Sequence, residues 1–165
     1  MITVIIPTLN DAARLVACLS PLVPASMEGL IRELIIVDGG STDETLEIAE
    51  DAGARVVTTF EGGLDQAAAL AKGPWLLVLD PQVVLERGWE TAVRTHVSAR
   101  RSAVRITLAR EGGGLWSKLF APGARAELFL KQAGPVDGGG RGGHRGQQRI
   151  GKAGRLNGAR GLIQD

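Results

Sequence analysis

The chain has 165 residues, of which 44% are hydrophobic, with a formal net charge of +1 and one cysteine, Cys18. This length suits one domain with a sizeable core, which must be aliphatic because only 4% of residues are aromatic. A lone cysteine excludes an internal disulfide and a metal site built on cysteines, and it fits a reducing compartment. No run approaches the roughly 20 apolar residues of a membrane helix, and the apolar start has no basic lead-in, so we expect a cytoplasmic protein without a signal peptide.

The charge is unevenly distributed along the chain. Residues 1–99 contain six basic and fourteen acidic side chains, a net charge of −8, which leaves +9 for the remainder. A basic half indicates an anionic partner, which could be phosphate, a membrane surface or nucleic acid. Nucleic acid is disfavoured, because the Gly/Arg-rich residues from Gly134 onward contain no aromatic side chains to stack on bases.

The first part of the chain alternates short apolar runs with helical patterns. Ile2–Ile6 is predicted as a strand that ends at Pro7. Ala12–Ser20 has apolar residues at helical spacing, and Leu22–Leu30 is predicted as a connection. Leu34–Val37 is short and β-branched, which is typical of a strand buried on both faces.

This second strand ends at a carboxylate, Asp38, which is followed by two glycines. Ser41 and Glu44 have the spacing of a capping box, which predicts a helix beginning near Thr42. The carboxyl edge of an open α/β sheet is where ligands bind, so Asp38 could face a ligand. Asp before Gly is also ordinary turn chemistry, so Asp38 could instead cap the turn, and the sequence leaves both interpretations open.

The alternation continues further along the chain and then fades. Three more strands are predicted at Arg55–Thr59, Trp75–Leu79 and Ala103–Leu108, and two more helices at Leu64–Lys72 and Trp89–Ser98. The strand at Trp75–Leu79 again ends at a carboxylate, Asp80. Alternating strands and helices predict an α/β fold with a Rossmann-like, mostly parallel sheet and helices on both faces.

The chain is expected to divide into three parts. Residues 1–109 form the α/β core, and residues 110–133 form a short segment with an amphipathic pattern and a strand, Ala126–Leu130. Within that segment Leu115–Phe120 is either a core helix or a contact with a membrane interface. Residues 134–165 are rich in glycine and arginine and are expected to be weakly ordered, since they can bury little apolar surface.

Three polar loops should meet at one end of the predicted sheet. They are Pro7–Asn10, Asp38–Ser41 and Asp80–Gln82. A polar rim on an apolar sheet is the usual form of a site for a small ligand. The segments that carry these loops, Val4–Asn10, Glu33–Asp43 and Trp75–Asp80, resemble the family 2 glycosyltransferases of the GT-A fold, nearest the bacterial radical-SAM/selenodomain-associated transferase subgroup.

The resemblance implies a role for each matching position. A nucleotide-sugar donor, UDP- or GDP-linked, would be bound by Pro7, Thr8, Asn10, Asp38, Gly39 and Asp80. Asp38 would accept a hydrogen bond from the base. Asp80 matches the first position of the family's Asp-x-Asp motif, so Asp80 and Gln82 would hold a divalent cation, Mg²⁺ or Mn²⁺, that neutralises the leaving diphosphate. Gln82 replaces the motif's second carboxylate, which predicts weaker metal binding.

Two functions stay open on this evidence. The first is transfer of a sugar from a nucleotide-diphosphate donor to an unknown acceptor. The second is a catalytically inactive nucleotide-binding or interaction domain derived from the same fold, because the chain lacks the later Glu-Asp pair of inverting members and no catalytic base is assigned. A third, weaker interpretation is an anion-surface binder with peripheral contact at the inner face of the membrane, working through the basic part.

Overall fold

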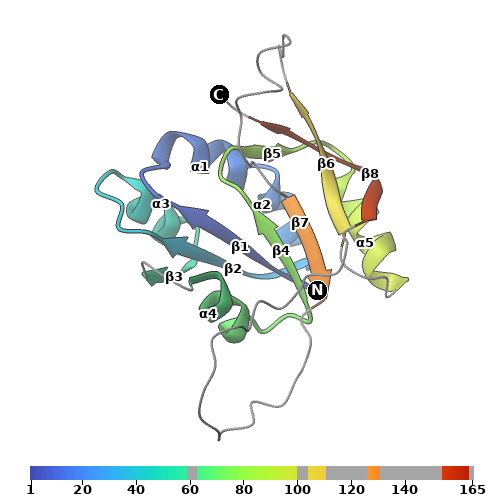
Figure 1. Ribbon diagram of the computed structural model, residues 1–165, viewed down its shortest axis with the longest axis horizontal. Helices are drawn as coiled ribbons and strands as arrows, with labels where there is room; N and C mark the ends of the chain where they lie inside the picture. The colour runs from blue at the N-terminus through green and yellow to red at the C-terminus, as the bar shows by residue number, and fades with distance from the viewer. Residues whose placement is uncertain (59–62, 100–103, 111–125, 131–153, 164–165) are drawn as a thin grey trace, which may run out of the picture.

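The computed structural model describes residues 1–58, 63–99, 104–110, 126–130 and 154–163, and an eight-stranded sheet forms its centre (Figure 1). The strands are β1 (Ile2–Thr8), β2 (Ile31–Asp38), β3 (Arg55–Thr58), β4 (Trp75–Leu79), β5 (Val83–Leu85), β6 (Val104–Arg110), β7 (Ala126–Leu130) and β8 (Gly154–Ile163). The helices are α1 (Ala12–Leu19), α2 (Leu22–Met27), α3 (Thr45–Asp51), α4 (Gly63–Leu70) and α5 (Trp89–Ser98). None of these helices is long and apolar enough to cross a membrane.

The strand order is β3-β2-β1-β4-β7-β6-β8-β5. The predicted strands of the first half pair in parallel: β1 pairs with β2 and β4, and β2 pairs with β3. In this register Ile5 lies between Ile35 and Val78, and Thr8 is opposite Asp38. β6 and β8 also pair in parallel. β7 pairs antiparallel with β4. The mostly parallel α/β sheet predicted from the sequence is therefore confirmed, and the carboxyl ends of β1, β2 and β4 lie at one edge.

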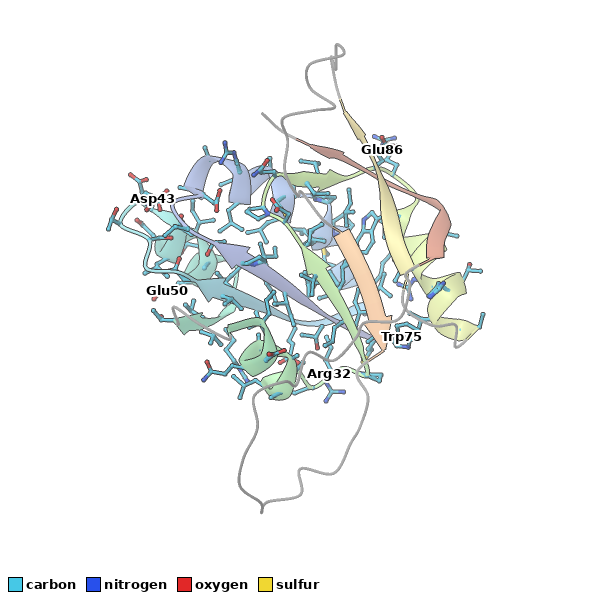
Figure 2. The ribbon with its side chains drawn as sticks, viewed as in Figure 1. Arg32, Asp43, Glu50, Trp75 and Glu86 are labelled. Atoms are coloured by element: carbon cyan, nitrogen blue, oxygen red, sulfur yellow. The ribbon has the colours of Figure 1, made fainter. Side chains whose placement is uncertain are left out.

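Helices cover both faces of this sheet, as predicted. On one face, Val4 and Ile6 of β1 belong to a buried cluster that includes side chains of α1, α2, α3 and α5. On the other face, Ile5 packs in a second cluster with Ala67 of α4. Neighbouring residues of β1 thus point to opposite faces, as the pleat of a strand requires. Figure 2 shows the apolar side chains filling the space between sheet and helices, with Asp43 and Glu50 at the periphery.

Prolines account for two differences from the predicted elements. Pro7 lies inside β1 and does not end it, because pairing with β4 stops at Ile5 and the strand is bonded on one side only beyond that point. The predicted connection Leu22–Leu30 is wrong over α2. Pro21 is the N-cap of that helix and Pro24 lies in its first turn, where a missing N–H costs nothing.

The later part of the chain differs from prediction in two strands. β5 was not predicted, and β8 lies within the segment expected to be weakly ordered, where it pairs with β6 and β5. Its glycine- and arginine-rich composition carries no strand signal, so the pairing is set by long-range contacts. β7 matches the predicted strand. The amphipathic segment 115–120 lies outside the described residues, and the division of the chain into three parts stays a prediction.

Candidate functional site

A cleft opens where β1 and β4 end, and it is lined by two of the three predicted polar loops. It has a volume of about 250 Å³ and is lined by Pro7, Thr8, Leu9, Asp11, Asp80, Pro81 and Gln82. We call it the β1–β4 cleft. It brings together four predicted site residues from two separate loops. Asn10, Asp38 and Gly39, which were predicted with them, are not part of its lining.

Asp80 is the cleft carboxylate that is available to a ligand. Its side chain is half-buried, and its Oδ1 accepts a hydrogen bond from the Gln82 backbone N–H at 3.0 Å. Within the described part of the chain, its Oδ2 accepts no hydrogen bond. The Gln82 side chain is also half-buried and lines the same cleft. Asp80 therefore has one carboxylate oxygen with which to meet a cation or a polar group.

Asp38 is buried and caps the turn after β2. Its Oδ2 accepts the backbone N–H groups of Gly40 and Ser41, both at 2.8 Å, and its Oδ1 accepts the hydroxyls of Thr8, at 3.1 Å, and Ser41. Burial raises the pKa of Asp38, but the hydrogen bonds from Ser41, Gly40 and Thr8 outweigh it and lower the pKa overall. The turn-capping interpretation describes this structure. Within the described residues, Thr8 is the cleft residue that bonds to Asp38, and the predicted hydrogen bond from Asp38 to a base stays a prediction.

Two further predicted residues serve the same turn. The Gly39 backbone N–H donates to the Thr8 carbonyl at 2.9 Å. The Asn10 backbone N–H donates to Ser41 Oγ at 2.9 Å, and Asn10 Oδ1 accepts the Thr42 N–H at 2.8 Å. The turn after β1 and the turn after β2 are therefore joined through backbone and side-chain contacts.

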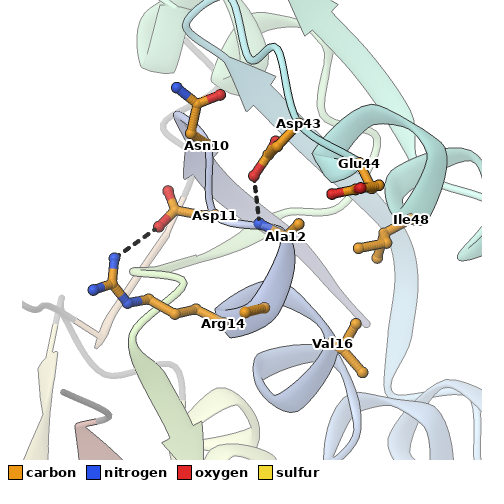
Figure 3. A pocket seen from close by; sticks show the side chains of 9 residues that line it. Asn10, Asp11, Ala12, Arg14, Val16, Asp43, Glu44 and Ile48 are labelled. Atoms are coloured by element: carbon orange, nitrogen blue, oxygen red, sulfur yellow. Dashed lines mark hydrogen bonds and ion pairs between the residues drawn. The ribbon is translucent and has the colours of Figure 1, made fainter.

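A larger open cavity lies beside the cleft between α1 and α3 (Figure 3). This α1–α3 cavity has a volume of about 850 Å³ and is lined by Asn10, Asp11, Ala12, Ala13, Arg14, Val16, Asp43, Glu44 and Ile48. Figure 3 shows Asp43 bonded to the Ala12 backbone and Arg14 bonded to Asp11. Asp11 lines both the α1–α3 cavity and the cleft.

Asp11 is a cleft residue that was not among the predicted site residues. Its side chain is 12% exposed; Oδ2 accepts the Leu9 N–H at 3.0 Å and Oδ1 accepts Arg14 Nη1 at 3.3 Å. It holds the N-cap position of α1 but makes no capping bond there. The signal that could have found it is its place directly after the polar rim Pro7–Asn10.

Asp43 accepts hydrogen bonds from the N-terminal N–H groups of both α1 and α3. Its Oδ2 accepts the Ala12 N–H at 3.1 Å, and its Oδ1 accepts the N–H of Thr45 at 3.1 Å and the Thr45 hydroxyl. The hydrogen bond from the Thr45 hydroxyl, helped by that from the Ala12 backbone, lowers the pKa of Asp43. The helix start near Thr42 is therefore wrong: α3 begins at Thr45, because the Ser41 hydroxyl donates to Asp38 and does not cap the helix.

Cys18 lies beneath the cleft as a small core residue. Its side chain is fully buried, and its Sγ donates to the Asp80 backbone carbonyl at 3.8 Å. Burial raises the pKa of the Cys18 thiol to about 12, with further contributions from the charges of Asp80 and Asp11. The thiol is therefore protonated and unreactive at neutral pH, and both carboxylates lie near the same atom.

The side chains of the cleft provide only some of the oxygen ligands that a hard cation needs. Among the residues that the structure describes, no group of three or more His, Cys, Asp and Glu side chains is placed to hold a metal ion. Asp80 offers one carboxylate and Gln82 one amide oxygen. Mg²⁺-type sites commonly use one or two carboxylates and take further oxygens from substrate phosphates. These residues therefore fit a cation that arrives with a phosphate ligand.

Known proteins resemble this chain over most of its first 124 residues. The model of the family "Glycosyl transferase family 2" matches residues 3–124. A PGL/p-HBAD biosynthesis glycosyltransferase of Mycobacterium bovis is 43% identical over 89 residues, which cover 48% of this chain and 34% of that protein. Glycosyltransferase AglJ of Haloferax volcanii is 30% identical over 137 residues, which cover 73% of this chain and 44% of that protein. The chain thus spans less than half the length of these relatives.

Solved structures show the same fold. Residues 1–349 of S. aureus TarS superpose with a TM-score of 0.63 at 19% identity, covering 79% of this chain and 47% of that fragment. Glucosyl-3-phosphoglycerate synthase from Mycobacterium tuberculosis, in complex with Mn²⁺, UDP and phosphoglyceric acid, gives a TM-score of 0.56 at 21% identity, covering 79% of this chain and 56% of that one. At these identities the likeness establishes the GT-A fold alone. Because the family match covers well over half of the sequence, the chain belongs to glycosyl transferase family 2.

Proposed function

We propose that this chain binds a nucleotide-diphosphate sugar, UDP- or GDP-linked, and transfers the sugar to an acceptor that is not yet identified. The observation that carries the proposal is the half-buried carboxylate of Asp80 beside Gln82 in the β1–β4 cleft, at the carboxyl edge of a parallel sheet. The motifs Val4–Asn10 and Glu33–Asp43 support a place nearest the radical-SAM/selenodomain-associated subgroup.

The size of the cleft limits what it holds by itself. Pockets that enclose a small ligand have volumes of about 300–1,000 Å³, and the β1–β4 cleft has about 250 Å³. It would therefore hold one end of a donor, with Pro7 and Leu9 offering apolar surface and Asp80 and Gln82 offering oxygens. The sugar and the acceptor would extend beyond the lining residues named here.

The charge of the cleft supports a metal requirement. Asp80 and Asp11 are both acidic, and among the side chains that the structure describes only Asp11 has a cationic partner, Arg14 at 3.3 Å. A diphosphate is itself an anion, so it would be repelled by Asp80 unless a cation lay between them. Asp80 and Gln82 would hold Mg²⁺ or Mn²⁺, and the ion would neutralise the charge that develops on the departing diphosphate.

Calorimetry with UDP and GDP, with and without Mn²⁺, tests this proposal. We expect one nucleotide to bind in the presence of Mn²⁺ and at least about tenfold more weakly without it. The isosteric change Asp80→Asn should abolish this metal dependence. Asp51→Asn, at an exposed acid at the end of α3, is the matched control and should bind like the wild type. Failure of both nucleotides to bind under any condition would refute the proposal.

Donor hydrolysis separates transfer from the inactive alternative. The observation that favours the alternative is Gln82 at the second position of the metal motif, since an amide brings no charge to the ion. Mn²⁺-dependent release of the nucleotide from UDP-sugar or GDP-sugar supports an active transferase. Binding without any release supports an inactive nucleotide-binding domain. A contact with the inner face of the membrane stays a sequence prediction, because residues 115–120 lie outside the described part.

A further inference from the structure

The turn at Asn10 lies between the two cavities of the site. Leu9 lines the β1–β4 cleft and Asp11 lines both cavities, whereas Asn10 lines only the α1–α3 cavity. Asn10 has a φ of +54°, and it is the single non-glycine residue with positive φ in the part of the chain described here. This left-handed conformation is costly for most residues, and asparagine tolerates it better than other side chains. The turn therefore has a shape that few residue types accept.

Hydrogen bonds fasten this turn to the loop after β2. The Asn10 N–H donates to Ser41 Oγ at 2.9 Å, and Ser41 Oγ in turn donates to the buried carboxylate of Asp38. Asn10 Oδ1 accepts both the N–H and the hydroxyl of Thr42, at 2.8 and 3.3 Å. Two donors fill the two lone pairs of that oxygen. It therefore has no capacity left to accept a hydrogen bond from a ligand.

The turn also orients the cleft wall on either side of Asn10. The Leu9 N–H donates to Asp11 Oδ2 at 3.0 Å, so these two residues close a local loop around Asn10. The Asp11 N–H donates to Thr45 Oγ1 at 2.9 Å, which ties the far side of the turn to the start of α3. A change in the backbone at Asn10 would consequently move two residues that line the cleft.

We propose that Asn10 is a positioning residue for the β1–β4 cleft, which sets Leu9 and Asp11 against the ligand without touching it. The inference rests on the proposed function, because it takes this cleft as the place where the nucleotide of the donor binds. It replaces the direct nucleotide contact that the family resemblance implied for Asn10. The sequence resemblance could not separate the two roles, since both require the same residue at the same position.

A pair of substitutions at Asn10 tests the proposal. Asn10→Gly and Asn10→Ala both remove the side-chain bonds to Thr42, but only glycine keeps the left-handed backbone without strain. With UDP or GDP and Mn²⁺, we expect the Kd to rise about threefold in Asn10→Gly and about tenfold or more in Asn10→Ala. Asn10→Asp retains the acceptor oxygen and should restore most of the affinity. Equal losses in the glycine and alanine variants would indicate direct contact and overturn the proposal.

A control separates positioning from general instability. Gly53 also has a left-handed backbone, with φ +67°, and a Cβ placed there meets nothing within 4 Å. Gly53→Ala therefore introduces the same kind of strain at the end of α3, away from the cleft. We expect it to lower the Tm but leave the Kd unchanged. If Gly53→Ala weakens nucleotide binding as much as Asn10→Ala does, the effect at Asn10 is only a loss of stability and the proposal fails.

Ser41→Ala tests the same role from outside both cavities. It removes the acceptor of the Asn10 N–H while leaving Asn10 in place. We expect it to raise the Kd about as much as Asn10→Gly, and wild-type affinity would overturn the proposal. If the wild type binds no nucleotide, the proposed function fails, and the role of Asn10 is then tested separately by amide hydrogen exchange of the ligand-free protein. The Asn10 amide should exchange at least about tenfold faster in Ser41→Ala than in the wild type; an equal rate would refute positioning.

Discussion

Replacing Asp38 by alanine should lower the free energy of unfolding by about 3–5 kcal/mol, because the buried Thr8 hydroxyl and the partly buried donors of the turn would lose a charged acceptor. The carboxylate accepts the backbone N–H groups of Gly40 and Ser41 and the hydroxyls of Thr8 and Ser41, and its side chain is fully buried. Hydrogen bonds to a charged group are each worth roughly 1.5–3 kcal/mol, and orphaned donors that relax toward water recover part of the loss.

The isosteric change Asp38→Asn should cost less, about 1–2 kcal/mol. Its amide oxygen can accept the two backbone N–H groups, and its NH₂ can donate to the Thr8 and Ser41 hydroxyls after they rotate. Only the charge assistance is then lost. Urea unfolding followed by circular dichroism measures both variants, with Asp51→Ala as an exposed control within about 0.5 kcal/mol of the wild type. A loss below about 1 kcal/mol in Asp38→Ala would refute the view that this carboxylate organises the turn.

The pH dependence gives an independent check on Asp38. Its pKa in the folded protein lies below the ordinary value of 3.8, so the folded state favours the charged form. The stability it contributes is therefore complete above that ordinary value and is lost as pH falls through the lower folded pKa. Urea midpoints between pH 6 and pH 2 should fall less steeply in Asp38→Asn than in the wild type. Parallel curves would contradict the assignment.

Three further predictions concern the core. Gly73→Ala should cost about 1–3 kcal/mol in urea unfolding, because its Cβ would lie 2.9 Å from Thr3 Oγ1 and 3.0 Å from the Thr3 backbone nitrogen; an unchanged midpoint would contradict the close packing. Trp89→Ala should cost about 3–5 kcal/mol by the same assay, since the indole is fully buried and donates to the Pro21 carbonyl at 3.3 Å. Cys18 should resist iodoacetamide at pH 8 in the native protein and react fully in urea, because burial raises its pKa to about 12; mass spectrometry measures the labelled fraction, and rapid native labelling would contradict this.

The strands with the clearest apolar runs were predictable from the sequence. The edge of the sheet at which the polar residues after these strands lie was also predictable. Trp75–Leu79 matches β4 as predicted, and Asp80 lies in the cleft at its end. The roles of the acidic side chains were harder to predict from the sequence. Asp38 was expected to meet a ligand or cap a turn, and which of these it does depends on Thr8, thirty positions away. A contact of that range leaves no local pattern.

Two other features of the fold were not predicted correctly, for related reasons. The start of α3 was misplaced because Ser41 has two competing partners, the helix and Asp38, and the sequence does not rank them. β8 was missed because its pairing with β6 and β5 joins segments far apart in the chain. Local propensity predicts elements, and tertiary pairing decides which of them share a sheet.

The place of β1 within the sheet has a consequence for how the chain is made. β1 leaves the ribosome before the other strands described here, yet its second neighbour, β4, begins only at Trp75. Until then one long edge of a strongly apolar segment has no partner, and such edges recruit other nascent chains. A pause in translation before β4 has left the ribosome should therefore promote aggregation, whereas a pause after β4 has emerged should be harmless to β1.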